Sequence, residues 1–215
     1  RGMLRDLATY IEKDIVVIVG FVDRQGKDIF NAAAVLYRKK IQGVYHKMLL
    51  PNYGVFDEKR YFKEGSCAWV FQCGKIVFGV SICEDIWGKD GPTKQQARAG
   101  AKIIFNINAS PYHMGKIKER QDIIRAQARS NHLYIAYTNL VGGQDELVFD
   151  GQSMIVDGNG TIVGRGEAFK ESLMLTDVAL PAGSPKKTKE TIVLSHEFPL
   201  NEKPALTKEE VKALE

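Results

Sequence analysis

The stretch of residues 68–138 alternates short apolar runs with segments of helical spacing, and this alternation constrains the fold more than any other feature. The apolar runs are four to eight residues long, which favours strands over buried helices. The expected strands are Ala68–Gln72, Lys75–Ile82, Lys102–Ile107 and Leu133–Thr138. Helices are expected at Thr93–Gly100 and Lys116–Asn131. Strands that alternate with helices are typical of layered α/β proteins.

The flanking segments add further strand signals. Apolar residues at helical spacing from Leu4 to Ile11 predict a helix that leads into a wholly apolar strand, Asp14–Gly20, of the kind buried on both faces. A turn at Asp23–Lys27 leads to a strand at Asn31–Tyr37, and residues 46–65 are expected to be irregular. The remaining expected elements are a hairpin of Ser153–Val156 and Thr161–Val163 around Asp157–Gly160, and a strand at Leu173–Val178.

Composition limits the classes of function that this chain can have. The 215 residues are 44% hydrophobic and 26% charged, as in an ordinary globular domain. The net charge of +4 comes from a lysine-rich tail, so the rest of the chain is close to neutral and the sequence gives no sign of a basic surface for nucleic acid. The apolar runs are too short to cross a bilayer and no signal peptide is recognised, so a cytoplasmic protein is expected. The three cysteines and four histidines lack disulfide or metal spacing, so no metal site is expected.

The last part of the chain differs from the rest. Beyond Pro181 the sequence is rich in Pro, Lys, Glu and Ser, so residues 1–182 are expected to form the domain and Gly183–Glu215 a linker, with a short helix at Thr207–Leu214. The Gly142-Gly143 pair does not lie between a strand and a helix, so it is interpreted as a flexible loop rather than a nucleotide site.

Cys83 stands where the apolar segment from Val77 ends, and two acids follow it. A strand that stops at a cysteine exposes the thiol, and the next backbone N–H, that of Glu84, can point at an oxyanion. A cysteine at this place is more often inert packing, so the segment alone leaves both interpretations open.

Lys47 lies among apolar residues, in the segment from Tyr45 to Glu58. A lysine in apolar surroundings can form a buried cation that stabilises a nearby thiolate and a tetrahedral oxyanion. The alternative is a solvated lysine in a polar loop, which is the commoner case.

Taken together, four segments resemble the nitrilase, or carbon–nitrogen hydrolase, superfamily, and within it the glutaminase domains of glutamine-dependent NAD synthetases. The segments are Lys-Met-Leu-Leu-Pro-Asn-Tyr-Gly-Val-Phe-Asp-Glu (47–58), Ser-Ile-Cys-Glu-Asp-Ile-Trp (81–87), Asn-Ala-Ser-Pro-Tyr (108–112) and Gly-Gly-Gln-Asp-Glu-Leu-Val-Phe-Asp-Gly (142–151). The resemblance runs from about Leu4 to about Val178. It implies a four-layer α-β-β-α fold and a homo-oligomer that stacks helical faces, for which Ile123 and Ile124 are candidates unless the domain's own sheet buries them.

The resemblance also implies roles for single residues. Lys47 and Cys83 match the last two members of the superfamily's Glu–Lys–Cys triad. Glutamine contacts fall at Tyr53, Ser110 and Lys116, and the backbone N–H of Glu84 would hold the oxyanion. Glu58 falls where a second acid lies near the triad, and Phe56 is either a wall of the substrate site or core packing. Without the resemblance, capping and solvent exposure explain Ser110 and Lys116 equally well.

The first member of the triad, a glutamate, has no match in this sequence. It is expected upstream of Arg1, since Glu12 falls at a helix end where a solvated role is expected. A C-terminal synthetase domain that uses ATP and magnesium to amidate deamido-NAD is expected downstream, while the domain itself needs no cofactor. Two alternatives are a stand-alone amidase of the same superfamily and a non-catalytic domain that lacks the base.

Overall fold

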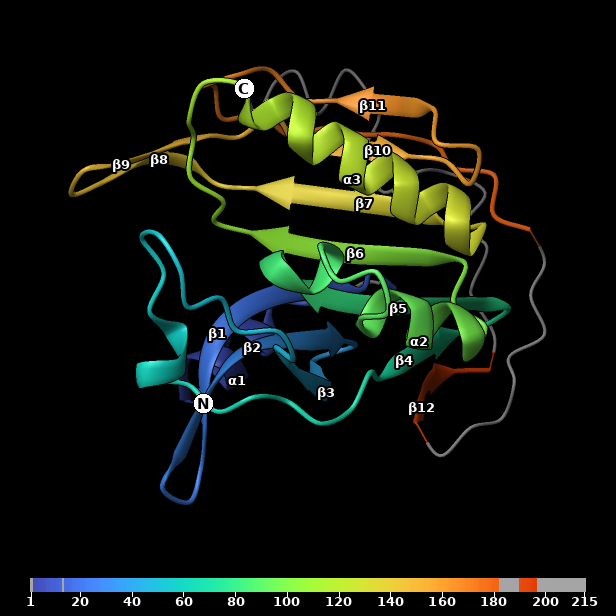
Figure 1. The fold of residues 1–215 in the computed structure, drawn as a ribbon. Helices are drawn as coiled ribbons and strands as arrows, with labels where there is room; N and C mark the ends of the chain where they lie inside the picture. Colours follow the sequence, from blue (N-terminus) through green and yellow to red (C-terminus); the bar gives the residue numbers. More distant parts are fainter. Residues whose placement is uncertain (1, 13, 182–189, 197–215) are drawn as a thin grey trace.

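The computed structural model describes residues 2–12, 14–181 and 190–196, and its elements form four layers (Figure 1). The helices are α1 (Gly2–Thr9), α2 (Pro92–Arg98) and α3 (Lys116–Asn131), with 3₁₀ turns η1 (Glu58–Arg60) and η2 (Cys83–Ile86). The helices predicted around residues 4–11, 93–100 and 116–131 are therefore confirmed.

The smaller sheet has three antiparallel strands, β1 (Val17–Gln25), β2 (Asp28–Tyr37) and β3 (Lys40–His46), in that order. The expectation that the first strand is buried on both faces is wrong for the described residues, because β1 forms an edge of this sheet and much of it is only partly buried. β3 was not expected. Its hairpin turn uses Arg38 and Lys39 with φ of 45° and 62°. Turns with this left-handed backbone usually contain glycine or asparagine, so the sequence did not predict one here.

The larger sheet has the strand order β11-β10-β7-β6-β5-β4-β12. Its strands are β4 (Val70–Cys73), β5 (Ile76–Ile82), β6 (Ile103–Asn108), β7 (Tyr134–Asn139), β10 (Met154–Val156), β11 (Ile162–Arg165) and β12 (Thr191–Ser195). β5, β6 and β7 are parallel neighbours, so their carboxyl ends meet at one edge of the sheet (Figure 1). In α/β sheets, such an edge is where functional side chains gather.

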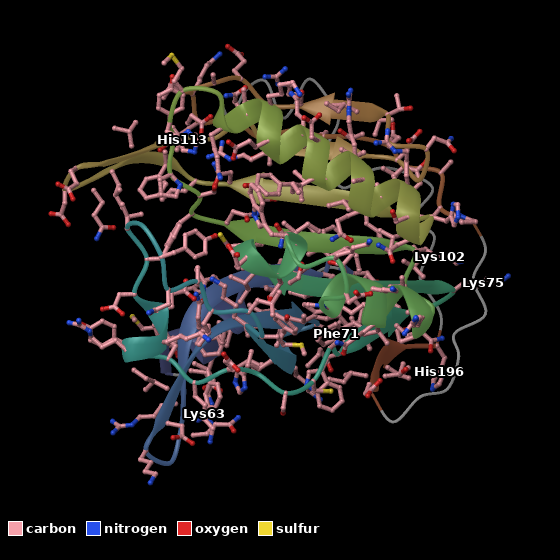
Figure 2. All side chains as sticks on the ribbon, viewed as in Figure 1. Lys63, Phe71, Lys75, Lys102, His113 and His196 are labelled. Carbon is pink, nitrogen blue, oxygen red and sulfur yellow. The ribbon has the colours of Figure 1, made fainter. Side chains whose placement is uncertain are left out.

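The two sheets pack face to face, and helices cover their outer faces. Residues of β2, such as Val35 and Tyr37, share one buried cluster with residues of β4 and β5, including Phe71, which Figure 2 labels. α3 packs on the other face of the larger sheet, where Ile124 is 1% exposed, and α1 packs on the smaller sheet. The order α1, small sheet, large sheet, α2 with α3 is the predicted four-layer α-β-β-α fold, and the domain's own core accounts for Ile124.

Three further expectations differ from the structure. Gly142 and Gly143 belong to β8 (Val141–Gln144), which pairs with β9 (Leu147–Asp150), so they are not a flexible loop. The turn of this hairpin has Asp145 at φ 51°, and glycines in a strand give little strand signal. Residues 173–178 lie outside any strand, although four of the six residues in Leu-Met-Leu-Thr-Asp-Val are apolar.

Part of the expected linker is structured. Residues 191–195 form β12, which pairs in parallel with β4 at the edge of the larger sheet. The helix expected at 207–214 lies outside the described residues. None of the described helices has the length and apolar character needed to cross a membrane. Within the described ranges, no three His, Cys, Asp or Glu side chains gather as metal ligands would.

Candidate active site

Cys83 follows β5 directly, at the edge where β5, β6 and β7 end (Figure 1). Its backbone is left-handed, with φ of 44°, which is uncommon for a residue other than glycine. The chain therefore turns sharply at Cys83 and enters η2. The side chain lines a cavity of about 570 Å³ that opens between the two sheets. Left-handed backbone at a residue other than glycine is a form of local strain that functional sites often hold.

Lys47 follows β3 and points into the same cavity. Its side chain is 1% exposed, and Nζ donates to both carboxylate oxygens of Glu58, at 2.7 and 2.8 Å. The backbone is held on two sides, because Lys47 N–H donates to Asn31 O and Gly65 N–H donates to Lys47 O, each at 2.8 Å. Gly65 is required for this approach, since a Cβ there would lie 2.1 Å from the carbonyl oxygen of His46.

The cavity combines one cation, one carboxylate and one thiol with apolar walls. Asn31, Phe56, Glu58 and Asn108 line it together with Lys47 and Cys83, and Ile18, Phe21, Ile82, Ile107 and Leu140 are among the apolar lining residues. Asn31 donates weakly to Glu58, at 3.4 Å, so the acid that holds Lys47 has a second partner. Phe56, expected as either a wall or core packing, is a wall of the cavity.

Burial raises the pKa of the Cys83 thiol to about 11, and this is the largest influence on it. The charge of Lys47 acts in the opposite direction and lowers the pKa, while Glu58, Glu84 and Asp85 raise it. The thiol is therefore protonated near neutral pH in the state described. A nucleophilic role for Cys83 requires a general base to take the proton as the new bond forms.

Tyr53 and Glu84 form a pair beside the turn that begins at Cys83. Tyr53 Oη donates to Glu84 Oε2 at 2.8 Å, and the Tyr53 ring meets Phe56 edge to face, with centroids 5.9 Å apart. Partial burial of the hydroxyl end and the bond to Glu84 raise the pKa of Tyr53 to about 12, so its hydroxyl remains a donor. Tyr53 is 58% exposed, and neither residue lines the cavity itself.

Ser110 does not line the cavity, although the residue before it, Ala109, does. It is buried, and its hydroxyl accepts the Nε–H of Arg120 at 3.3 Å, while its carbonyl accepts Nη2–H at 2.7 Å. Arg120 is itself fully buried and forms an ion pair with the buried Asp150, at 2.6 Å. The loop that carries Ser110 is thus fixed from α3.

Lys116 begins α3 and lies against Trp87, the residue that caps η2. Its Nζ is 4.3 Å from the ring centroid of Trp87 and 3.0 Å from Glu119 Oε2. A cation over an indole face is attracted by the ring quadrupole. Lys116 also lies outside the cavity lining, but Trp87 connects it to the segment of Cys83. The loop before α3, where Figure 2 labels His113, runs beside β9 through the bond of Tyr112 N–H to Val148 O.

Several residues of the site were not anticipated from the sequence: Asn31, Asp85, Trp87 and Arg120. The signal for Asp85 and Trp87 was available, since both belong to the segment Ser-Ile-Cys-Glu-Asp-Ile-Trp that carries Cys83. Arg120 lies at the first turns of a helix with few apolar residues, where a solvated cation is the usual expectation. The other cysteines are elsewhere: Cys73 is buried in the core between the sheets, and neither it nor Cys67 lines the cavity.

Comparisons with known proteins identify the family of this chain. The sequence profile of the family described as carbon–nitrogen hydrolase matches residues 4–186. Glutamine-dependent NAD(+) synthetases are 45% identical in Thermotoga maritima and 43% in Aquifex aeolicus, over 83% and 81% of this chain. The matches cover 32% and 30% of those proteins, so the chain spans about a third of the length of the curated relatives.

Solved structures give the same picture. The glutamine-dependent NAD+ synthetase of Acinetobacter baumannii, solved with ADP, superposes with a TM-score of 0.74 at 38% identity, over 84% of this chain and 37% of that one. A carbon–nitrogen hydrolase of Helicobacter pylori superposes with a TM-score of 0.67 at 25% identity, over 77% of this chain and 62% of that one.

Proposed function

We propose that this chain, which belongs to the carbon–nitrogen hydrolase family, hydrolyses the side-chain amide of glutamine and releases ammonia. The observation that carries the proposal is the placement of Cys83 and the buried Lys47 in one cavity. The names of the relatives supply the substrate, since glutamine-dependent NAD synthetases take nitrogen from glutamine.

In the proposed reaction the Cys83 sulfur attacks the carboxamide carbon as its proton passes to a general base. The carbonyl oxygen becomes an oxyanion, which the Lys47 ammonium and the backbone N–H of Glu84 stabilise. The amide nitrogen takes a proton and leaves as ammonia, so a thioester remains on Cys83. Water then attacks the thioester with the help of the same base, and glutamate and the free thiol are released.

The acids that lie near Cys83 in the described residues already have other partners. Both oxygens of Glu58 hold Lys47, Asp85 is fully buried with four donors around it, and Glu84 accepts the Tyr53 hydroxyl through Oε2. A proton acceptor must have a free lone pair directed at the thiol. We therefore assign the base to a glutamate that precedes these residues in the polypeptide, as the family pattern implies.

Recognition of the amino-acid end of glutamine is assigned to polar groups outside the cavity. A free amino acid presents an ammonium and a carboxylate, and both must find partners when they leave water. The Tyr53–Glu84 pair offers acceptor oxygens for the ammonium, and Lys116 offers a cation for the carboxylate. Ser110, fixed by Arg120, is the third proposed contact.

The ammonia is proposed to serve a synthetase domain of the same polypeptide, which would use ATP and magnesium to amidate deamido-NAD. The support is that the chain spans about a third of its NAD-synthetase relatives. The test is an assay of the whole polypeptide with glutamine and then with ammonium as sole nitrogen donor. Cys83→Ala should abolish NAD formation from glutamine and keep it from ammonium. Absence of NAD formation from either donor would favour a stand-alone amidase instead.

A further inference from the structure

Asp85 is a fully buried carboxylate two residues after Cys83, with both of its oxygens engaged. Oδ1 accepts the backbone N–H of Met48 at 3.1 Å and that of Leu49 at 2.8 Å. These amides belong to the two residues that directly follow Lys47. Oδ1 therefore holds the loop that presents the cation.

The other oxygen of Asp85 holds the turn that begins at Cys83. Oδ2 accepts the backbone N–H of Ile82 at 3.0 Å and the hydroxyl of Tyr45 at 2.7 Å. Ile82 is the residue before Cys83, and Tyr45 is a fully buried residue of β3, two positions before Lys47. One carboxylate thus joins the residues on both sides of Lys47 to the residue that precedes Cys83.

We propose that Asp85 is a positioning residue, whose carboxylate sets the place of the Lys47 ammonium relative to the Cys83 sulfur. The inference rests on the proposed function, because it assigns Lys47 to the thiolate and the oxyanion. Four donors bind the two carboxylate oxygens. Three of them come from residues 36 to 40 positions earlier in the chain, and the fourth comes from Ile82 at the end of β5. A displacement of about 1 Å between catalytic groups can lower a rate by about 10²-fold.

The four donors require the ionised form of Asp85. A protonated carboxyl group, or an amide, would place a donor where the N–H groups of the loop or of Ile82 already point. Burial raises the pKa of Asp85 to about 6, while the donors and Lys47 act against this rise, so the carboxylate is the main form at neutral pH. Asp85→Asn keeps the shape and breaks the pattern of acceptors.

A positioning role and a simple charge effect predict opposite shifts of the Cys83 thiol. The negative charge of Asp85 raises the pKa of Cys83, so removing the charge alone would lower that pKa. Removing the connection should instead move Lys47 away from the sulfur and raise the pKa, because Lys47 is the group that lowers it. The direction of the shift separates the two explanations.

The experiment uses the whole polypeptide in the wild-type form and as Asp85→Asn, Tyr45→Phe and Asp150→Asn. Glutamate release gives the glutaminase rate. The rate of alkylation of Cys83 by iodoacetamide, followed by mass spectrometry at several pH values below the thiol pKa of about 11, follows the thiolate fraction, so an upward shift of the titration slows alkylation at every pH. Asp150→Asn is the matched control, because Asp150 is also a fully buried carboxylate but binds Arg120. Thermal unfolding shows the loss of stability in each variant.

We expect Asp85→Asn to release glutamate about 100-fold more slowly and to shift the thiol titration upward. Tyr45→Phe removes one donor and should give a smaller fall and a smaller upward shift, and it keeps the test open if Asp85→Asn does not fold. Asp150→Asn should lose stability without moving the titration. A titration in either Asp85→Asn or Tyr45→Phe that stays in place or moves downward would overturn the assignment. A wild-type protein that releases no glutamate would refute the proposed function, whereas the alkylation result would still decide the role of Asp85.

Discussion

The ammonium of Lys47 is shared between the two carboxylate oxygens of Glu58, at 2.7 and 2.8 Å, on the wall of the cavity that also holds the Cys83 thiol. The side chain of Lys47 is 1% exposed and that of Glu58 is 18% exposed, so the pair is largely withdrawn from water. A buried cation needs such a partner, because an ammonium withdrawn from water without a counter-charge is costly in free energy. Glu58 therefore supplies the counter-charge of Lys47 and fixes the position of its ammonium.

Replacing Glu58 with glutamine should lower glutamate release by about 10²-fold, since the Lys47 ammonium loses its counter-charge and its fixed position. The steady-state rate of glutamate release measures this effect. Glu64→Gln is the control, because Glu64 follows on the same loop and pairs with Lys59 in an exposed position. Equal rates in Glu58→Gln and wild type would exclude this role.

Lys116→Ala should raise KM for glutamine by about 10-fold and lower kcat much less. The reason is that a cation bound to the substrate carboxylate stabilises the bound substrate and the transition state equally. The control is Lys118→Ala, since Lys118 lies in the first turn of α3 but is 80% exposed and pairs with Asp122. A fall in kcat with unchanged KM would place Lys116 in the chemistry rather than in recognition.

Arg120→Met should destabilise the fold by about 3–5 kcal/mol, because it leaves the carboxylate of Asp150 buried without its cation. Both side chains are 0% exposed, so water cannot replace the lost partner. The free energy of unfolding from urea titration gives the value. The double variant Arg120→Met with Asp150→Leu should recover part of the loss, and a double variant less stable than the single one would contradict this account of the pair.

The pH dependence of Cys83 follows from its raised pKa of about 11. An ordinary thiol titrates near the reference value of 9.0, so between pH 9 and 11 the unfolded chain gives up this proton before the folded one does. The contribution of Cys83 to stability is therefore fully present below about pH 9 and is lost as the pH rises toward 11. Urea unfolding of wild type and Cys83→Ala at pH 8 and pH 10.5 measures it. The wild type should lose stability relative to Cys83→Ala when the pH rises from 8 to 10.5. A difference in unfolding free energy that is the same at both pH values would contradict the raised pKa of Cys83.

Much of the larger sheet could be predicted, because its central strands are apolar runs of the length that a buried parallel strand requires. The end of β5 at Cys83 and the course of α3 from Lys116 to Asn131 follow from the same patterns. β3 could not be predicted, since its turn at Arg38-Lys39 is left-handed without glycine. β8 was also not predicted, because its glycines suggested a loop although they lie within a paired strand.

The positions of Cys83 and Lys47 were predicted from their motifs, whereas their surroundings depend on contacts distant in sequence. Whether Asp85 is solvated or buried is decided by donors from Tyr45, Met48 and Leu49, which only the packing of the two sheets brings near it. The contact between Lys116 and Trp87 has the same origin. Local sequence patterns carry no information on such pairs.

The most direct test of the account compares glutamate release from glutamine by the whole polypeptide in the wild type, Cys83→Ala, Cys67→Ala and Cys73→Ala. Only Cys83 lies in the cavity with Lys47, so Cys83→Ala should reduce glutamate release to background while Cys67→Ala and Cys73→Ala keep it. Mass spectrometry of the stopped wild-type reaction should find a glutamyl adduct on the peptide that contains Cys83. Glutamate release that persists in Cys83→Ala would contradict the central claim.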